Sequence, residues 1–333
     1  DGITFTPWSD ISNAAPPDEV FVATEDSVAF TKITDMLITN KRHCMVVGPS
    51  GSGKSIIIQN MLAAKAETTY TLSLTLSAQT TAIQFQETIE SKMESKRKTL
   101  LGPPEGKSAC FIVDDIIMPK PEQYGAQPPL EVLRQYMGYG GFFNRKDLSW
   151  IDVNDLTIIA ACQPPGGGRN MISPRLLSQF TQLYLNEPSE TSMSTIFTTI
   201  LNVYFKRVKY PDTVTTLTEK VVKASVNVFE KVCQEFLPTP SRSHYTFNLR
   251  DLAHVFVGIR TGRPEVVYAP ETLIDLWEHE NFRIYSDRLV DKTDRDNFVD
   301  LITGLKKKFF QVDETEERVR PVFTDFVSHD GYY

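Results

Sequence analysis

Residues 48–55 have the types and the spacing of a loop that binds the phosphates of a nucleoside triphosphate; they are Gly48-Pro49-Ser50-Gly51-Ser52-Gly53-Lys54-Ser55. Glycines let the backbone curl so that successive N–H groups face phosphate oxygens, and a following helix adds its partial positive charge. We expect Lys54 to reach the β- and γ-phosphates and the Ser55 hydroxyl to bind Mg²⁺. The alternative is a Gly/Ser-rich turn that binds nothing. The largely apolar segments at 43–47 and 56–62 favour the first interpretation, because they predict a strand entering the loop and a helix leaving it.

Two carboxylates follow another apolar run, at residues 110–113. A site of this kind needs an acidic group for Mg²⁺ at the end of a neighbouring strand, and Asp114 is expected to hold the metal through water. Asp115 stands where a Glu usually polarises the attacking water, and its side chain is shorter by about 1.5 Å, one carbon–carbon bond. Misplacement of a reacting group by about 1 Å can cost ~10²-fold in rate. The alternative for the pair is a strand end without catalytic function.

Three further polar residues could act on a bound phosphate. Gln163 follows the apolar run 156–162, and it either faces the γ-phosphate or begins a solvated Gly-rich turn. Arg175 and Arg250 each stand near the start of a predicted helix. Each could stabilise the charge of a transferred phosphate, or form a surface ion pair that contributes little. The residue types alone leave these alternatives open.

Composition limits the classes of function. The chain has 333 residues, 41% of them apolar and 23% charged, which is typical of a globular protein long enough for two domains. A net charge of −7 argues against a nucleic-acid partner, and no run of 18 apolar residues predicts a membrane span. The cysteines lack metal-ligand spacing and are interpreted as reduced thiols of a cytosolic protein; they are Cys44, Cys110, Cys162 and Cys233. The first residue, Asp1, suggests a segment of a longer chain.

The order of predicted elements indicates two parts. Up to residue 188, strands alternate with helices, which predicts a parallel five-stranded sheet with helices on both faces. The strands are expected at 43–47, 70–76, 109–113, 156–162 and 182–185, and the helices at 24–40, 56–62, 81–98, 129–139 and 173–180. From residue 189 to 310 only helices are expected, at 190–209, 213–236, 249–260, 270–285 and 289–310. Residues 311–333 form a linker.

Taken together, these residues resemble the dynein heavy chain family, and specifically its third AAA+ module of the axonemal type. The resemblance covers nearly the whole chain. The blocks most specific to the family are Tyr124-Gly125-Ala126-Gln127-Pro128-Pro129-Leu130-Glu131-Val132-Leu133-Arg134-Gln135 and Pro164-Pro165-Gly166-Gly167-Gly168-Arg169-Asn170. Gly102-Pro103-Pro104, Ser173-Pro174-Arg175 and Phe247-Asn248-Leu249-Arg250-Asp251-Leu252 add to it.

The resemblance implies a P-loop NTPase fold of the AAA+ type. Residues 1–188 would be the large α/β subdomain, 189–310 the small helical subdomain and 311–333 a linker toward the next module. It implies ATP or ADP with Mg²⁺ as ligands. Other AAA+ modules in a ring of six would be partners, and the microtubule would be contacted only through the whole motor. The implied location is cytoskeletal, in the axoneme of a cilium or flagellum.

The resemblance also assigns site residues. Gln163 would be the sensor on the fourth strand, Arg250 the sensor of the small subdomain, and Arg175 a finger toward the neighbouring module's site. The adenine would be bordered by Val22, Ala23 and Thr24. Asp115 in place of Glu, and Gln163 in place of the more usual Asn, predict a regulatory site with slow or no hydrolysis. The alternatives are a self-sufficient oligomeric AAA+ ATPase and a nucleotide-free structural module.

Overall fold

The computed structural model describes residues 21–164, 166, 170–312 and 322–323. Two compact units divide the chain: one is Glu25–Glu187, and the other combines residues 1–24 with 188–333. The predicted linker at 311–333 lies almost entirely outside the described residues.

The first unit is built on a five-stranded parallel sheet with the strand order β2-β5-β8-β1-β9. The strands are β1 (Cys44–Val47), β2 (Thr69–Thr75), β5 (Ser108–Asp114), β8 (Leu156–Cys162) and β9 (Thr181–Tyr184). All seven residues of β8 are buried, as expected of a strand that is covered on both faces.

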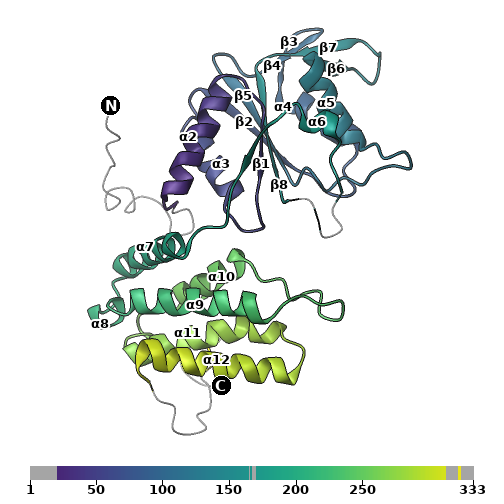
Figure 1. The fold of residues 1–333 in the computed structure, drawn as a ribbon. Coiled ribbons are helices and arrows are strands. Elements are labelled where there is room, and N and C mark those ends of the chain that lie inside the picture. The colour runs from purple at the N-terminus through teal and green to yellow at the C-terminus, as the bar shows by residue number, and fades with distance from the viewer. Residues whose placement is uncertain (1–20, 165, 167–169, 313–321, 324–333) are drawn as a thin grey trace, which may run out of the picture. The chain divides into compact units, whose positions relative to one another are not determined.

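Helices cover both faces of this sheet. Figure 1 shows α2 (Glu25–Thr39) and α3 (Lys54–Ala63) on one side of it. On the other side lie α4 (Ala82–Lys92), α5 (Pro128–Tyr139) and α6 (Pro174–Leu177). Apolar side chains of α4, α5 and α6 pack in one core with those of β2, β5 and β8. The predicted fold class, a P-loop α/β sheet followed by a helical region, is confirmed.

A second, four-stranded sheet was not predicted. Its order is β3-β4-β7-β6, formed by β3 (Glu94–Arg97), β4 (Leu100–Gly102), β7 (Trp150–Val153) and β6 (Gly141–Phe143). The prediction of a helix over 81–98 is therefore wrong in its last part: α4 ends at Lys92, and Met93 has an extended backbone with φ −103° and ψ 150°. The exposed residues of β3 offer no apolar face to a helix, whereas pairing with β4 satisfies their backbone groups.

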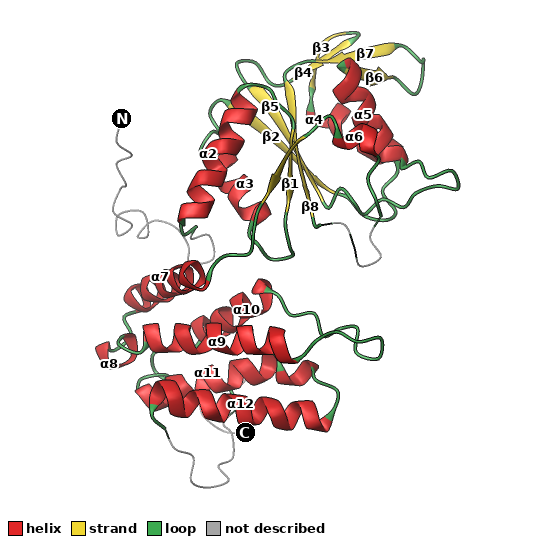
Figure 2. Ribbon diagram, viewed as in Figure 1, coloured by secondary structure: helices red, strands yellow, loops and turns green. Residues whose placement is uncertain are grey.

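The second unit is helical, as Figure 2 shows. It contains α7 (Glu190–Val208), α8 (Asp212–Thr215), α9 (Thr218–Glu235), α10 (Leu249–Thr261), α11 (Pro270–Ile284) and α12 (Lys292–Phe310), with a 3₁₀ turn η1 (Ser286–Arg288) before α12. The single helix predicted over 213–236 is instead two helices, α8 and α9. Aromatic side chains fill its core, among them Phe205, Tyr245, Phe256, Trp277, Tyr285 and Phe298.

Two predictions from composition can be compared with the described residues. None of the helices described is long and apolar enough to cross a membrane. The four cysteines are free thiols, and three of them are buried. Burial raises the pKa of the Cys44 and Cys110 thiols to about 12, so both stay protonated and unreactive at neutral pH.

A half-buried histidine joins the start of β1 to β8. The Ile158 N–H donates to Nδ1 of His43 at 3.0 Å, and the His43 ring packs edge-on against Tyr136. Burial lowers the pKa of His43 from 6.5, because the charged form is poorly solvated there. Neutral His43 therefore supports the fold above its ordinary pKa.

We predict that this contribution is lost as the pH falls below 6.5 and through the lowered pKa of the folded state. Urea unfolding at pH about 7.5 and about 5.5 measures the loss of unfolding free energy across the range in which histidine titrates. A His43→Asn variant keeps an acceptor but does not titrate, so its loss should be smaller. Equal losses in the two proteins would contradict this account.

Candidate functional site

The predicted phosphate loop connects β1 to α3 with a glycine-dependent backbone. Gly51 and Gly53 have φ values of 82° and 86°, in the left-handed region that side chains with a Cβ rarely adopt. Gly53 immediately precedes α3 and serves as its N-cap. The loop thus ends at the N-terminus of a ten-residue helix, where free N–H groups and the helix dipole favour an anion.

Gly48 is required for a different reason: there is no room for a Cβ atom at this position. A Cβ at this position would lie 2.5 Å from the carbonyl oxygen of Leu185, the residue after β9. The Gly48 N–H donates to the Cys162 carbonyl at 3.1 Å. The first residue of the loop therefore packs between the ends of β8 and β9, which fixes the position of the loop relative to the sheet.

Lys54 turns its side chain back over the loop. Its Nζ donates to the carbonyl oxygens of Gly48 at 2.9 Å and Pro49 at 2.7 Å, and the residue is only 9% exposed. These bonds hold a cation over the first residues of the loop. A partly desolvated ammonium in this place can form strong charge-assisted hydrogen bonds to phosphate oxygens.

One hydrogen bond connects the loop to the acidic strand end. Ser55 Oγ donates to Asp114 Oδ2 at 2.9 Å, joining the first turn of α3 to the end of β5. The other carboxylate oxygen of Asp114 accepts the Asp115 N–H at 3.0 Å. A hydroxyl and a carboxylate side by side are the hard oxygen donors that Mg²⁺ prefers. The residues present therefore fit a Mg²⁺-bound nucleotide.

Asp115 differs from its neighbour in backbone conformation. Its φ is 52°, which places a non-glycine residue in the left-handed region. The chain turns sharply here, and the next N–H, of Ile116, donates to the Ala161 carbonyl at 3.2 Å. Asp tolerates this conformation better than most side chains. A Glu at this position would lengthen the carboxylate on a backbone that disfavours it.

Gln163 follows the last residue of β8, beside the start of the loop. Burial raises the pKa of the Cys162 thiol to about 11; the Lys54 ammonium opposes this shift and the Asp115 carboxylate reinforces it. The Cys162 carbonyl accepts the Gly48 N–H and the Ala161 carbonyl accepts the Ile116 N–H, so the loop and the acidic strand end both lie beside the end of β8. Gln163 is half-buried there, and within the described residues its amide has no hydrogen bond. The structure therefore brings Gln163 to the loop and the acidic strand end.

The two arginines are both exposed. Arg175 lies in α6, which is N-capped by Ser173, on the surface of the α/β unit. Arg250 is the second residue of α10, in the helical unit. Across the residues that the structure describes, neither guanidinium has an ion pair. Arg250 belongs to the other unit than the loop, and the predicted roles of both arginines stay predictions.

Comparison with known proteins identifies the family. Residues 9–188 match the model of the P-loop containing dynein motor region, and residues 221–320 match that of the AAA+ lid domain. The chain belongs to the dynein heavy chain family. The predicted resemblance to dynein is confirmed at this level.

The relatives of this dynein chain include human dynein axonemal heavy chain 1, which is 39% identical over 98% of the chain, and human dynein axonemal heavy chain 6, 38% identical over 92% of it. The chain spans 8% of the length of each of these relatives. Among solved structures, a RuvB mutant from Thermotoga maritima aligns with a TM-score of 0.47 at 14% identity, covering 87% of this chain and 78% of the other.

The resemblance assigns Val22, Ala23 and Thr24 to the border of the adenine. Val22 is buried, Ala23 is exposed and Thr24 is half-buried, and all three group with the helical unit. Their predicted contact with adenine stays a prediction. Residues 165 and 167–169, from the Gly-rich block, lie outside the described residues.

The sequence reasoning missed how the N-terminus of α10 is held. Asn248 and Asp251 form a reciprocal capping box around Arg250. An Asn followed three residues later by an acid at a helix start is a recognisable signal for such a box, and Asn248 and Asp251 have this spacing.

We predict that Gly48→Ala destabilises the dynein chain by about 1–3 kcal/mol, because the new methyl must displace the Leu185 carbonyl. Gly138→Ala is the matched control: it lies in α5, and an added Cβ meets nothing within 4 Å. The control should be neutral or slightly stabilising. Urea unfolding measures both, and equal effects would contradict the close approach at Gly48.

We also predict that Asp114→Asn raises the Mg²⁺ concentration needed for half-maximal nucleotide binding roughly tenfold or more, since a negative oxygen donor is lost. The control, Asp155→Asn, removes the same charge from the residue before β8, at the opposite edge of the sheet, where Asp155 pairs with Lys41 at 2.5 Å. Titration of a fluorescent ADP analogue with Mg²⁺ reads out both. If the two variants behave alike, Asp114 has no special part in metal binding.

Proposed function

We propose that this chain is an ATP- or ADP-binding AAA+ module of an axonemal dynein heavy chain, with a regulatory site that hydrolyses ATP slowly or not at all. The hydrogen bond from Ser55 to Asp114 is the observation that carries the proposal. It joins the phosphate loop to the acidic strand end, so the groups that would hold the phosphate and the metal lie next to each other.

In this proposal the loop holds the phosphates and the acidic strand holds the metal. Lys54 and the N-terminus of α3 neutralise phosphate charge. Ser55 and Asp114 orient Mg²⁺, which when bound withdraws charge from the phosphate oxygens. Among the described residues no group of three or more His, Cys, Asp or Glu side chains could hold a metal alone. The metal would therefore need the phosphates and water to complete its oxygen shell.

Slow turnover follows from the groups that should complete the reaction. The Asp115 carboxylate is one methylene shorter than that of Glu, and its left-handed backbone restricts where it can point. Gln163 replaces the more usual Asn. An arginine finger would come from the following module, and such a finger is worth ~10³–10⁵ in rate where it acts. Binding groups are thus complete, whereas catalytic groups are weakened.

The finer assignment rests on the family blocks. The block over 124–135 supports the third position in the motor ring, with residues 1–188 as the large subdomain, 189–310 as the small one and 311–333 as a linker. Within the ring, Arg175 serves the preceding module's site, Arg250 reads the γ-phosphate, and Val22, Ala23 and Thr24 border the adenine. The partners are neighbouring modules and, through the whole motor only, the microtubule. The relatives' names support an axonemal location.

We predict that the chain binds Mg·ADP and Mg·ATP but turns over far less than one ATP per second. Isothermal calorimetry measures binding, and continuous phosphate release measures turnover. Lys54→Ala is the control, because loss of the loop cation should abolish binding and any contaminating ATPase would remain. A rate of several per second that disappears in Lys54→Ala would support a self-sufficient ATPase instead. Absence of binding at millimolar ligand would support a nucleotide-free structural module.

A further inference from the structure

Arg250 lies in the first turn of α10. That turn is held by its capping box and also by contacts from a distant part of the sequence. The Asn248 N–H donates to Asp251 Oδ2 at 2.9 Å, and the Arg250 N–H donates to Asn248 Oδ1 at 2.8 Å. These bonds fix the backbone of the first turn. The Arg250 side chain, in contrast, is exposed and has no ion pair within the described part of the chain. Its direction therefore depends on how the first turn of the helix is held.

A second arginine fixes that turn from a distant part of the sequence. Arg288, in the turn η1, donates through its Nη1 atom to Asp251 Oδ1 at 2.9 Å. Its Nη2 atom donates to the carbonyls of His244 and Thr246, each at 3.1 Å. The guanidinium also lies over the Phe247 ring, 4.7 Å from its centre. One planar group thus bonds both to the chain entering α10 and to the carboxylate inside its cap.

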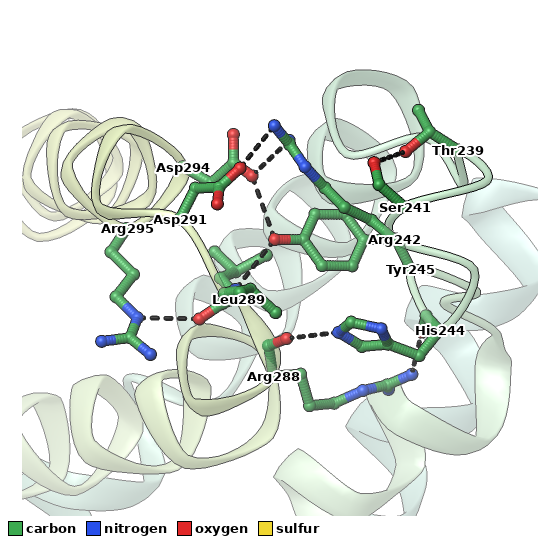
Figure 3. Close-up of polar contacts among 11 residues, drawn as sticks. Thr239, Ser241, Arg242, His244, Tyr245, Arg288, Leu289, Asp291, Asp294 and Arg295 are labelled. Atoms are coloured by element: carbon green, nitrogen blue, oxygen red, sulfur yellow. Dashed lines mark hydrogen bonds and ion pairs between the residues drawn. The ribbon is translucent and has the colours of Figure 1, made fainter.

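The segment that leads into α10, residues 242–247, is also bonded at a second place that does not involve α10. Arg242 pairs with Asp291 and donates to Asp294 Oδ2 at 2.6 Å. The Tyr245 hydroxyl donates to that Asp294 oxygen at 3.0 Å and accepts the Val290 N–H at 2.9 Å. Figure 3 shows Arg242 facing the two aspartates and Arg288 lying on the other side of Tyr245, toward His244. The segment 242–247 is therefore held at two separate places.

We infer that Arg288 is a positioning residue: through Asp251 it fixes the direction of Arg250 and so sets how strongly the site distinguishes ATP from ADP. The inference rests on the proposed role of Arg250 as the reader of the γ-phosphate. Its physical basis is preorganisation, since a contact made only with ATP is strongest when the contacting group needs no reorientation. Lys cannot replace Arg288, because an ammonium lacks the planar fork that reaches acceptors in several directions.

The test measures dissociation constants of the full chain for Mg·ADP and for a non-hydrolysable ATP analogue with Mg²⁺. Arg250→Ala should lower the preference for the ATP analogue, and Arg288→Gln should lower it by roughly fivefold or more while ADP affinity changes little. Arg242→Gln is the matched control, since its side chain is 35% exposed against 33% for Arg288 and it holds the same segment. It should reduce unfolding free energy comparably and leave the preference unchanged.

Two further variants separate positioning from charge. Arg288→Lys should behave like Arg288→Gln, and the double variant Arg250→Ala/Arg288→Gln should match Arg250→Ala alone, because the two residues act as one unit. If Arg250→Ala has no effect on the preference, the proposed role of Arg250 fails, and the inference with it. If Arg250→Ala lowers the preference but Arg288→Gln does not, only the inference fails. Rescue by Lys, an equal effect of Arg242→Gln, or additivity in the double variant would also overturn it.

Discussion

A single hydrogen bond, from the Ser55 hydroxyl to the Asp114 carboxylate, is the interaction on which this site depends. The two residues stand 59 positions apart: Ser55 lies in α3, which follows β1, and Asp114 ends β5, with β8 between β1 and β5. The bond can form only if β1, β8 and β5 end at the same edge of the sheet. Their parallel pairing provides this, with Val47 opposite Cys162 and Val113 opposite Ala160. Burial of these strands on both faces is therefore what aligns the loop with the acidic strand end.

The elements that position the site were predictable because each has a strong local signal. The seven buried residues of β8 were predicted with their observed bounds, since a short buried strand of this kind is bordered by polar or turn residues. The loop could be located because its glycines and lysine have a fixed spacing. Gly48 shows the limit of such reasoning: its pattern was visible, but the 2.5 Å approach to Leu185 depends on β9, far along the chain.

The features that escaped prediction are those that depend on distant partners. Strand β3 has four exposed residues and no apolar alternation, so only its pairing with β4 distinguishes it from the end of a polar helix. The left-handed backbone of Asp115 results from a sharp turn against the neighbouring strand. Arg288 bonds to a residue 37 positions earlier, and nothing in its own sequence neighbourhood indicates this. Local pattern thus predicted the loop and the acidic strand end, whereas the pairing of β3, the backbone of Asp115 and the contacts of Arg288 required the fold.

We propose that this chain has a complete set of groups for holding a nucleotide, whereas the groups that would hydrolyse it are weakened. The most direct test is to incubate the chain with Mg·ATP, remove free nucleotide, denature the protein and quantify what is released. We predict ATP or ADP in the released fraction of the wild type and none from Lys54→Ala, whose loop lacks its cation. Absence of nucleotide from both proteins would contradict the claim, as would equal amounts from both.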